Sequence, residues 1–506
     1  MTQRLVTLAS SAPGFYGLNK QQSGDVLPAG WASEAKNAAF DTIGRLAARK
    51  GSKNQHSSSV ASNPESGHEY IDGAGNRLKI FAADNKIYKE VSGTITDISG
   101  TITTPTANDW QFTNFNGKCI AVQAGHDPIF MATTGGSFAD IVMGTSTYDL
   151  LTIEPNNILA AFGRCWFIKD NFLYFSDPLD ETVVDGRLNL FSVWRHGSDE
   201  GVVLSEFNGL LLIFGRRNIA IYQGAGDPVG VGFGLVENIA DIGCIARDSI
   251  QSIGTDLMFL SYTGVRSLRR TIQDGNAPLN DVSRNNRDYI LGFYSEAEKI
   301  RSVHFEKDRF YLLSFPSKSK VFCFDVLSPL EDGSFRMTEW DVEHNCYIAT
   351  YDSELYIGHN NFFCKYEGYT DGQTSAGVAG TTYSYNFEGP WNDFGEEVQG
   401  YLKIPKKGTL YFYSEQSTSI NYKWAFDYKD DFETRQIISR AFDVSEWNID
   451  EWGLAEFGSI GGFEETRVRC SRSGRIIKFG CEVPVVGGEF ALQRIDVQAK
   501  IGKLVP

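Results

Sequence analysis

Histidine, cysteine and carboxylate side chains are the residues of this chain that could hold a metal ion, and their spacing decides whether they can. The seven histidines are scattered, with no HExxH motif and no pair four residues apart, at positions 56, 68, 126, 196, 304, 344 and 359. The tightest group is Glu343, His344, Asn345 and Cys346, and neighbours on a strand point to opposite faces. Because a metal site needs converging ligands, we predict none.

The glycine-rich segment GAGDPVGVGFG at 224–234 has the composition of a nucleotide-binding loop. It lacks the Lys-Ser or Lys-Thr pair of a phosphate loop, and it does not fit a GxGxxG motif that opens a helix. The sequence also has no GxSxG motif, which would present a nucleophilic serine on a sharp turn. We therefore predict a turn from one blade to the next at this segment, no cofactor and no catalytic residues.

Glycoside hydrolysis would require two carboxylates held near the axis of a propeller. The acidic candidates at predicted turns are Asp170, Asp177, Asp256, Asp308 and Asp325. No pair among them stands out, and the sialidase repeat Ser-x-Asp-x-Gly-x-Thr-Trp is missing. Segments 424–435 and 447–458 mix acidic and aromatic residues, which favours solvated strands with buried rings over a sugar-binding platform. A carbohydrate-binding or glycoside-hydrolysing propeller stays open as the alternative to a non-enzymatic role.

The charge balance of the chain argues against a protein that grips nucleic acid. The 506 residues include 47 Lys and Arg against 63 Asp and Glu, which gives a formal net charge of −16. Nucleic-acid-binding proteins normally carry a basic excess or a basic stripe, and the sequence displays neither. An acidic surface past which DNA slides without adhering is compatible with this balance.

Cysteine usage and hydropathy predict a chain that is used without export. The eight cysteines form no CxxC motif, and several lie in apolar, strand-like runs, which favours reduced, buried thiols: Cys119, Cys165, Cys323 and Cys364. The N-terminal apolar stretch LVTLA is too short for a secretory signal. The most apolar run, at 210–214, is far shorter than the ~20 residues of a membrane-spanning helix. We expect assembly in a reducing cytoplasm and no membrane span.

The elements that would position any site recur along the chain. An apolar strand, a short turn and a second alternating strand appear at 76–93, 117–136, 163–181, 205–227, 255–274, 307–326 and 353–368. The equivalent strand positions, 42 to 53 residues apart, are Leu78, Ile120, Trp166, Leu211, Met258, Tyr311 and Leu355. A step near 45 residues holds four short strands, the size of one propeller blade. The sequence therefore predicts an all-β fold with a β-propeller of six or seven blades.

Three regions depart from this period. The longest spacing between equivalent strand positions, from Met258 to Tyr311, contains 279–300. We predict one or two helical turns there, with Asp281 or Ser283 as N-cap. From residue 378 the strands become longer and irregularly spaced, which predicts a sandwich-like β domain. We assign 1–70 to an extended N-terminal arm with a hairpin, 71–377 to the propeller and 378–506 to the sandwich. Within the arm, the polar tract 51–69 is expected to be a loop or a mobile arm.

Three stretches together resemble one protein family. Residues 12–51 contain a Gly-x-Asn segment, a Glu-Ala-x-Asn turn and a Gly-Arg-Leu…Arg-x-Gly hairpin. They are followed by IADIGCIARDSIQSIGTDLMFLSYTGVRSLRR (239–270) and SRSGRIIKFGCEVPVVGGEFALQRIDVQAKIGK (471–503). In this order, the stretches resemble the tail nozzle proteins of short-tailed bacteriophages, which are also called tail tubular or stabilisation proteins.

The resemblance implies a structural protein of the virion without enzyme activity or cofactor. It implies a homo-hexameric ring around the DNA ejection channel, joining the portal adaptor to the distal tail and meeting a fibre, spike, needle or plug protein. Six copies would carry about −96 in total, so we expect an acidic lumen that repels the passing duplex without binding it. Screening limits this repulsion to about 8–10 Å at physiological salt.

The N-terminal arm contains the residues that we predict to contact the adaptor or a neighbouring copy. They are Trp31, Phe40, Arg45 and Arg49, chosen because aromatic and arginine side chains anchor protein interfaces. The alternative for Trp31 and Phe40 is simple packing onto the propeller. A propeller scaffold from a cellular organism is a further alternative to the phage assignment.

Overall fold

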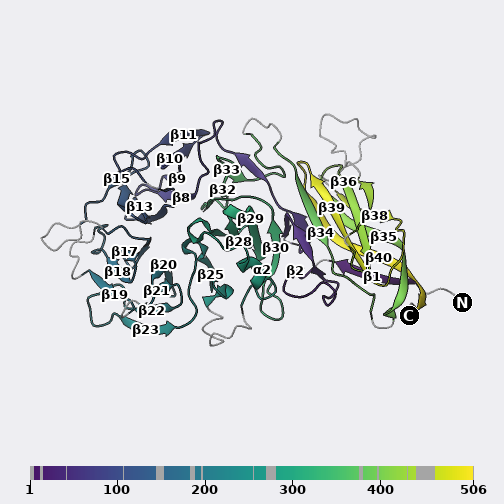
Figure 1. Ribbon diagram of the computed structural model, residues 1–506. Helices are drawn as coiled ribbons and strands as arrows, with labels where there is room; N and C mark the ends of the chain where they lie inside the picture. Colours follow the sequence, from purple (N-terminus) through teal and green to yellow (C-terminus); the bar gives the residue numbers. More distant parts are fainter. Residues whose placement is uncertain are drawn as a thin grey trace.

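The computed structural model describes residues 5–504, apart from 12–14, 42, 106, 144–152, 183–188, 195–197, 255, 269–280, 375–379, 396–397, 430 and 440–461. The fold is all-β, as predicted, with short helical turns between strands. Figure 1 shows an elongated molecule in which a propeller (left) lies beside a β-sandwich that contains both ends of the chain (right).

The described residues form a propeller of seven blades, each built from antiparallel strands that follow one another along the chain, except for one strand of blade 7. Blade 1 comprises β8 (Ser66–Ile71), β9 (Arg77–Ala83), β10 (Lys86–Val91) and β11 (Thr94–Asp97). Blade 2 comprises β12 (Gln111–Phe115), β13 (Lys118–Gln123), β14 (His126–Met131) and β15 (Ala139–Asp140). Blade 3 comprises β16 (Asn157–Ala161), β17 (Arg164–Lys169), β18 (Phe172–Phe175) and β19 (Leu190–Ser192). Blade 4 comprises β20 (Gly201–Phe207), β21 (Leu210–Gly215), β22 (Ile219–Gln223) and β23 (Gly234–Ile239). Blade 5 comprises β24 (Gln251–Ile253), β25 (Asp256–Ser261) and β26 (Gly264–Ser267). Blade 6 comprises β27 (Arg301–Phe305), β28 (Phe310–Phe315), β29 (Lys320–Asp325) and β30 (Arg336–Trp340). Blade 7 contains β31 (Tyr347–Ala349), β32 (Leu355–His359) and β33 (Phe362–Tyr366).

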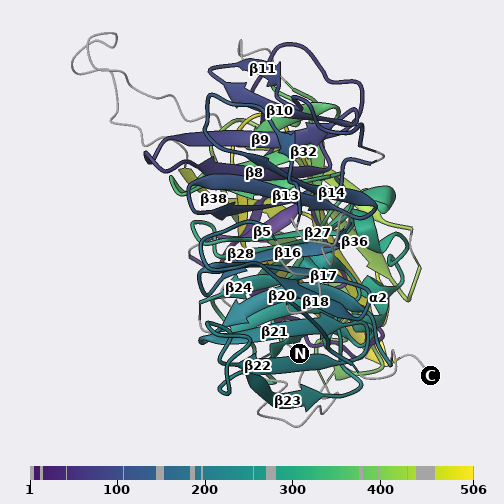
Figure 2. The same ribbon diagram turned by 90° about the vertical axis from the view of Figure 1, so that its left-hand side faces the viewer.

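The repeat found in the sequence corresponds to the second strand of each blade. This strand is apolar because it lies between the blades on either side, and each neighbouring pair of blades encloses a hydrophobic cluster. Local turn chemistry sets the hairpins: Asn116–Gly117 and Asn208–Gly209 adopt positive φ at both residues, the conformation of a tight type I′ turn. Figure 2 shows the blades following one another from β8 down to β23.

The ring of blades is closed by a strand from near the N-terminus. Strand β7 (Ser52–Asn54) pairs with β33 as the fourth strand of blade 7. Blade 7 then packs on blade 1, where the Phe363 ring lies 5.0 Å from that of Phe81. The expectation of a loop or mobile arm at 51–69 is therefore wrong at both ends of the tract, because Ser52–Asn54 and the start of β8 are paired strands.

The C-terminal domain is a sandwich of two sheets that enclose one core. One sheet contains β38 (Gly462–Val468), β35 (Tyr401–Ser414), β40 (Phe490–Leu504), β6 (Leu46–Ala48), β5 (Ala38–Phe40) and β1 (Leu5–Ser11). The other contains β4 (Glu34–Lys36), β34 (Tyr383–Glu388), β39 (Ile477–Val485), β36 (Ser419–Phe426) and β37 (Glu433–Ile438). The hairpin expected near Gly44 is present as β5 and β6.

Strand β4 joins the two domains. Lys36 pairs with Glu339 of β30 on one side and with Asn386 of β34 on the other, so blade 6 and the sandwich form one nine-stranded sheet. Two short strands, β2 (Gly17–Leu18) and β3 (Trp31–Ala32), pair beside this junction. The N-terminal segment thus fixes the sandwich against the propeller through backbone hydrogen bonds.

The helical turns predicted in 279–300 are confirmed as α2 (Arg287–Leu291) and η4 (Ala297–Lys299). Their start was predicted wrongly, since Asn286 and neither Asp281 nor Ser283 is the N-cap of α2. The Asn286 side chain does not cap the helix. It donates to Leu18 O and accepts from Lys20 N, and so binds the N-terminal segment instead.

All eight cysteines are free thiols, as predicted, and seven of them are buried. Burial raises the pKa of the Cys346 and Cys481 thiols to about 12. The described helices include none that is long and apolar enough to cross a bilayer.

Candidate functional site

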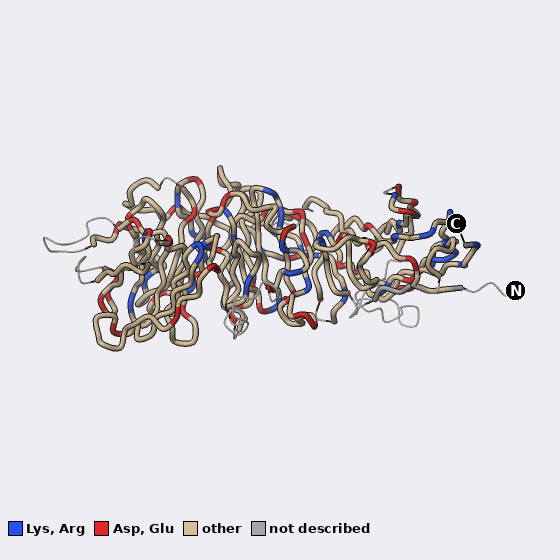
Figure 3. Tube along the Cα trace, turned by 60° about the horizontal axis from the view of Figure 1, so that its bottom comes forward, with Lys and Arg blue, Asp and Glu red and all other residues tan. Residues whose placement is uncertain are grey.

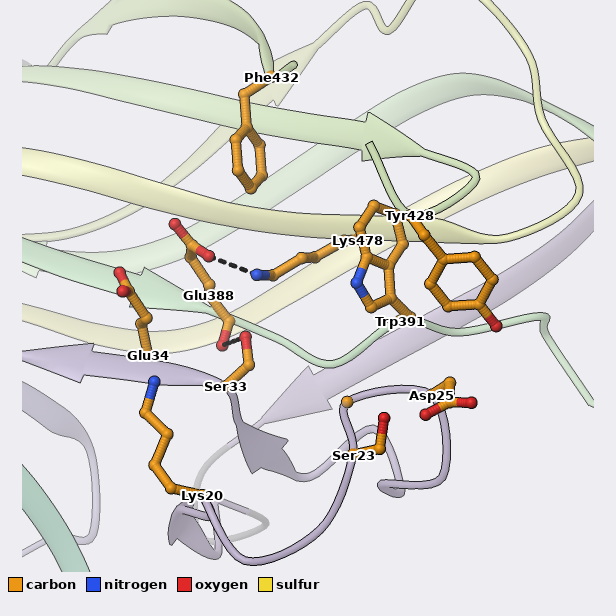
Figure 4. A pocket seen from close by; sticks show the side chains of 11 residues that line it. Lys20, Ser23, Asp25, Ser33, Glu34, Glu388, Trp391, Tyr428, Phe432 and Lys478 are labelled. Atoms are coloured by element: carbon orange, nitrogen blue, oxygen red, sulfur yellow. Dashed lines mark hydrogen bonds and ion pairs between the residues drawn. The ribbon is translucent and has the colours of Figure 1, made fainter. Parts of the chain in front are cut away.

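A pocket of about 600 Å³ lies where the N-terminal segment meets the sandwich. Its lining comes from the loop between β2 and β4 and from β34, β39 and the turn between β36 and β37 (Figure 4). The lining residues are Lys20, Ser23, Gly24, Asp25, Ser33, Glu34, Glu388, Trp391, Tyr428, Phe432 and Lys478.

Asparagine side chains hold the floor of the pocket in place. Asn19 Oδ1 accepts hydrogen bonds from the backbone N–H groups of Gln21 and Gln22, at 3.0 and 3.1 Å, and so closes a tight turn. Asn286 binds the same loop to the propeller. The sandwich side is fixed by Ser33, whose hydroxyl donates to Gly389 O at 2.9 Å.

Glu388 is the central charge of the pocket and is paired with two lysines. Its carboxylate contacts Lys423 Nζ and lies 2.6 Å from Lys478 Nζ. Burial acts to raise the pKa of Glu388, but the hydrogen bonds and charges of Lys423 and Lys478 outweigh it and hold the pKa below its usual range. Glu388 is therefore ionised at neutral pH and cannot serve as the general acid that glycoside hydrolysis requires.

Lys20 and Glu34 face each other across the pocket mouth (Figure 4). Burial lowers the pKa of Lys20, and its ammonium group lies 5.5 Å from the centre of the Tyr289 ring. Glu34 accepts from Asn386 Nδ2 at 2.5 Å and pairs with Lys36 at 3.0 Å. Both charged groups at the mouth are thus held in place by neighbours.

Three aromatic rings complete the pocket. The Trp391 and Tyr428 rings lie 5.3 Å apart, and Lys478 Nζ lies 5.9 Å from the centre of the Trp391 ring. Phe432 covers the same ammonium group at 5.6 Å. Tyr428 and Phe432 belong to the acidic-aromatic segment 424–435, for which buried rings on a solvated strand were predicted; the second such segment, 447–458, lies outside the described residues. Aromatic faces beside carboxylates are the surfaces that bind sugar rings in many proteins.

The propeller axis carries a second polar cluster. Arg247 donates to Asp109 O at 2.8 Å and to Asn156 O at 3.1 Å, and it pairs with Asp248 at 2.9 Å. Arg301 adds an ion pair with Asp248 at 3.2 Å. A cavity of about 190 Å³ lies beside these groups and is lined by residues of the innermost strands of several blades.

The four residues predicted to contact a partner lie apart from this pocket. Trp31 is half-buried and packs against the Tyr16 ring at 5.6 Å, and the Phe40 ring lies under the Arg336 guanidinium at 4.4 Å. Arg45 pairs with Asp41 at 2.6 Å.

Arg49, the fourth of these residues, is 1% exposed. It binds Asp371 through two hydrogen bonds of 2.8 and 2.7 Å and stacks on Tyr383 at 4.0 Å. Its contacts are therefore made inside this chain, between the N-terminal segment and the C-terminal end of the propeller.

The described residues considered as metal ligands do not converge, whereas two of the acidic candidates do. Among the described residues, no three His, Cys, Asp or Glu side chains converge as metal ligands do. His344 and His359 face each other at 6.2 Å, and His359 Nδ1 lies 2.8 Å from Glu343 O, a structural contact. Two of the acidic candidates, Asp308 and Asp325, line a second pocket of about 380 Å³. Each is held there in an ion pair, Asp308 with Lys50 and Asp325 with Arg336.

The sequence matches none of the protein families it was compared with, and none of the curated proteins. Three solved structures illustrate what the chain is similar to. A streptogramin B lyase is 11% identical, with a TM-score of 0.36 over 61% of this chain and 95% of that one. YCF48 bound to a D1 peptide is 12% identical, with a TM-score of 0.35 over 61% and 92%. The Pan2 WD40 domain of Neurospora crassa is 10% identical, with a TM-score of 0.36 over 60% and 90%.

Proposed function

We propose that this protein is a structural subunit of a short-tailed phage tail, assembled in the host cytoplasm as a six-membered ring around the DNA ejection channel. Its neighbours in the tail are the portal adaptor above and a fibre, spike or plug protein below. The ordered sequence resemblance described above motivates the assignment.

One structural observation supports the proposal most directly: β4 fuses the propeller and the sandwich into a single nine-stranded sheet. A ring that withstands the passage of DNA needs subunits whose parts do not rotate against each other. Domains joined only by a linker move relative to each other by default, whereas a shared sheet prevents such motion.

Electron microscopy of the purified chain, alone and with the portal adaptor protein of the same phage, tests the proposal. We expect six-fold rings with a central hole in at least one of the two samples. A chain that remains monomeric in both samples would contradict a ring-forming role.

Carbohydrate binding is a second candidate function, and the pocket is the observation that favours it. Trp391, Tyr428 and Phe432 offer ring faces, while Glu34 and Asp25 offer acceptors for sugar hydroxyl groups. The lowered pKa of Glu388 favours binding over hydrolysis. Screening on an array of bacterial surface glycans, with Trp391→Ala as the matched variant, tests it. A glycan signal that Trp391→Ala abolishes supports the candidate, and equal signals from both proteins contradict it.

A further inference from the structure

The outer edge of blade 4 is an apolar surface without a partner strand. We call the segment 227–241 the blade 4 edge. Strand β23 pairs with β22 on one side, and no described strand lies on its other side. Four large apolar side chains here are half or more exposed: Val229, Val231, Leu235 and Val236. Such an edge is a template for pairing with another chain unless the protein covers it.

Blades 1, 6 and 7 have outer edges that are covered or carry paired charges. The outer edge of blade 6 is covered by β4, and β33 of blade 7 is covered by β7. In blade 1, the outer strand β11 carries Asp97, which pairs with Lys86 at 2.9 Å. The blade 4 edge has neither a covering strand nor a lysine.

Exposed acidic residues surround the apolar side chains of the blade 4 edge. They are Asp227, Glu237 and Asp241, and the segment contains no basic residue. Of the two arginines in the nearby turn, Arg216 is neutralised by Glu200 at 3.0 Å. A partner for this surface would therefore be apolar and basic.

A basic surface lies on the sandwich, where the start of the long strand β35 meets the end of β40. Lys406, Lys407, Lys500 and Lys503 gather there, and 401–408 and 497–504 contain no acidic residue. Within the described part of the chain, none of these four lysines forms an ion pair. We call this surface the lysine end; Figure 3 shows blue segments gathered near the C-terminus, in a molecule that is elsewhere mixed in charge.

The lysine end also has an open strand edge. Strand β1 pairs with β40, with Leu5 opposite Lys500, and its other side has no described partner strand. The blade 4 edge and the lysine end therefore share two properties, an unpaired strand and exposed charge, and their charges are opposite.

The two surfaces lie at opposite ends of the elongated molecule, with β23 on the propeller side and β40 on the sandwich side (Figure 1). We propose that the blade 4 edge of one copy binds the lysine end of a second copy. A contact between two different surfaces repeats head to tail and closes into a ring when the rotation permits. The inference rests on the proposed ring function and adds which surfaces meet.

Charge reversal on each side tests the contact. The variants are Glu237→Lys on the blade 4 edge and Lys500→Glu with Lys503→Glu on the lysine end. Matched controls reverse exposed charges elsewhere on the surface, Glu306→Lys and Lys318→Glu. Sedimentation velocity of the full chain, with adaptor where the wild type needs it, measures assembly. We expect each variant to weaken assembly about tenfold or more, the combination of both to restore much of it, and the controls to assemble normally.

The outcomes separate the two proposals. Rings that form equally well in every variant would overturn this contact and leave the ring function standing. Loss of assembly in both variants without recovery in their combination would show that the two surfaces do not face each other. If the lysine-end variant lost only affinity for duplex DNA, the surface would be a nucleic-acid contact and the inference would fail. A wild-type chain that never assembles would defeat both proposals.

Discussion

Asp248 and Arg301 form an ion pair of 3.2 Å at the axis of the propeller, although they belong to different blades. Asp248 lies in η2 (Arg247–Ser249), before blade 5, and Arg301 begins blade 6. The Asp248 side chain keeps 23% exposure, which is to the small axial cavity that it lines. Burial acts to raise its pKa, but the charges of Arg247 and Arg301 outweigh this and lower it.

Removing the Asp248 carboxylate should destabilise the whole propeller. Asp248→Ala removes the carboxylate that is paired with two buried arginines, which costs about 3 kcal/mol in the free energy of unfolding. Because the folded-state pKa lies below the unfolded value, the stabilisation is present above about pH 4 and is lost on acidification through the lowered pKa. Urea unfolding of wild type and variant at pH 7 and pH 3 measures both effects; equal stability at pH 7 would refute the prediction.

The contribution of Asp281 to the free energy of unfolding should depend on pH in the opposite direction. It is 1% exposed, and burial raises its pKa to about 6, despite Arg287 at 3.6 Å. The folded state therefore binds the proton more tightly than the unfolded chain, and stability falls as pH rises from about 4 to about 6. Asp281→Asn removes this fall and should be more stable than wild type at pH 7, by up to about 2–3 kcal/mol. The two proteins should unfold at similar urea concentrations near pH 4.

The Arg49–Asp371 pair should be sensitive to the shape of the cation. Arg49 binds both carboxylate oxygens and also donates to Asn37 Oδ1 at 3.1 Å. A lysine keeps the charge but loses the paired geometry, so Arg49→Lys should cost about 2 kcal/mol and Arg49→Met about 3–5 kcal/mol. Thermal unfolding ranks the variants. If lysine were tolerated as well as arginine, charge alone would account for the contact.

Closure of the propeller should depend on Gly51. A Cβ atom at this position would lie 2.1 Å from Thr370 O, against backbone that cannot move aside easily. Gly51→Val should therefore displace β7 from blade 7. Hydrogen exchange should become faster at Ser52–Asn54 and along β33, while the sandwich strands β34 and β39 exchange as before. Unchanged protection in blade 7 would mean that β7 does not close the ring.

The cysteines should be inert in the folded protein. Burial raises the pKa of the Cys470 thiol, the one partly exposed cysteine, to about 12, so little thiolate forms at pH 8. A thiol reagent at pH 8 should modify none of the eight quickly in native protein and all eight in denaturant. Rapid native labelling at one site would identify a thiol that the structure leaves accessible.

The propeller could be predicted from the sequence because its second strands are continuous apolar runs. Positions such as Trp166 and Leu211 are buried between blades, and their spacing records the blade length directly. The strands that join the domains could not be found in this way. Strands β4, β5 and β6 have three residues each, too few to show a period, and β4 and β6 pair with strands hundreds of residues away.

The candidate site was missed for a related reason. Lys20, Trp391 and Lys478 come from distant segments, and no local motif relates them. Tyr428 and Phe432 belong to the acidic-aromatic segment 424–435. The alternation of polar and apolar residues along a strand does not show which aromatic rings line a pocket. Similarly, the lysines of β35 and β40 appear as a cluster only once these strands are paired.

Strand β1 pairs with the final long strand of the chain, Ser11 with Arg494 and Leu5 with Lys500. The residues of β1 must therefore wait until β40 has been synthesised before they acquire this native partner. Domains generally fold in the order of their synthesis, so the propeller blades can form while the sandwich is still incomplete. Translation products that stop before β40 would leave β1 without its partner strand and open to proteolysis.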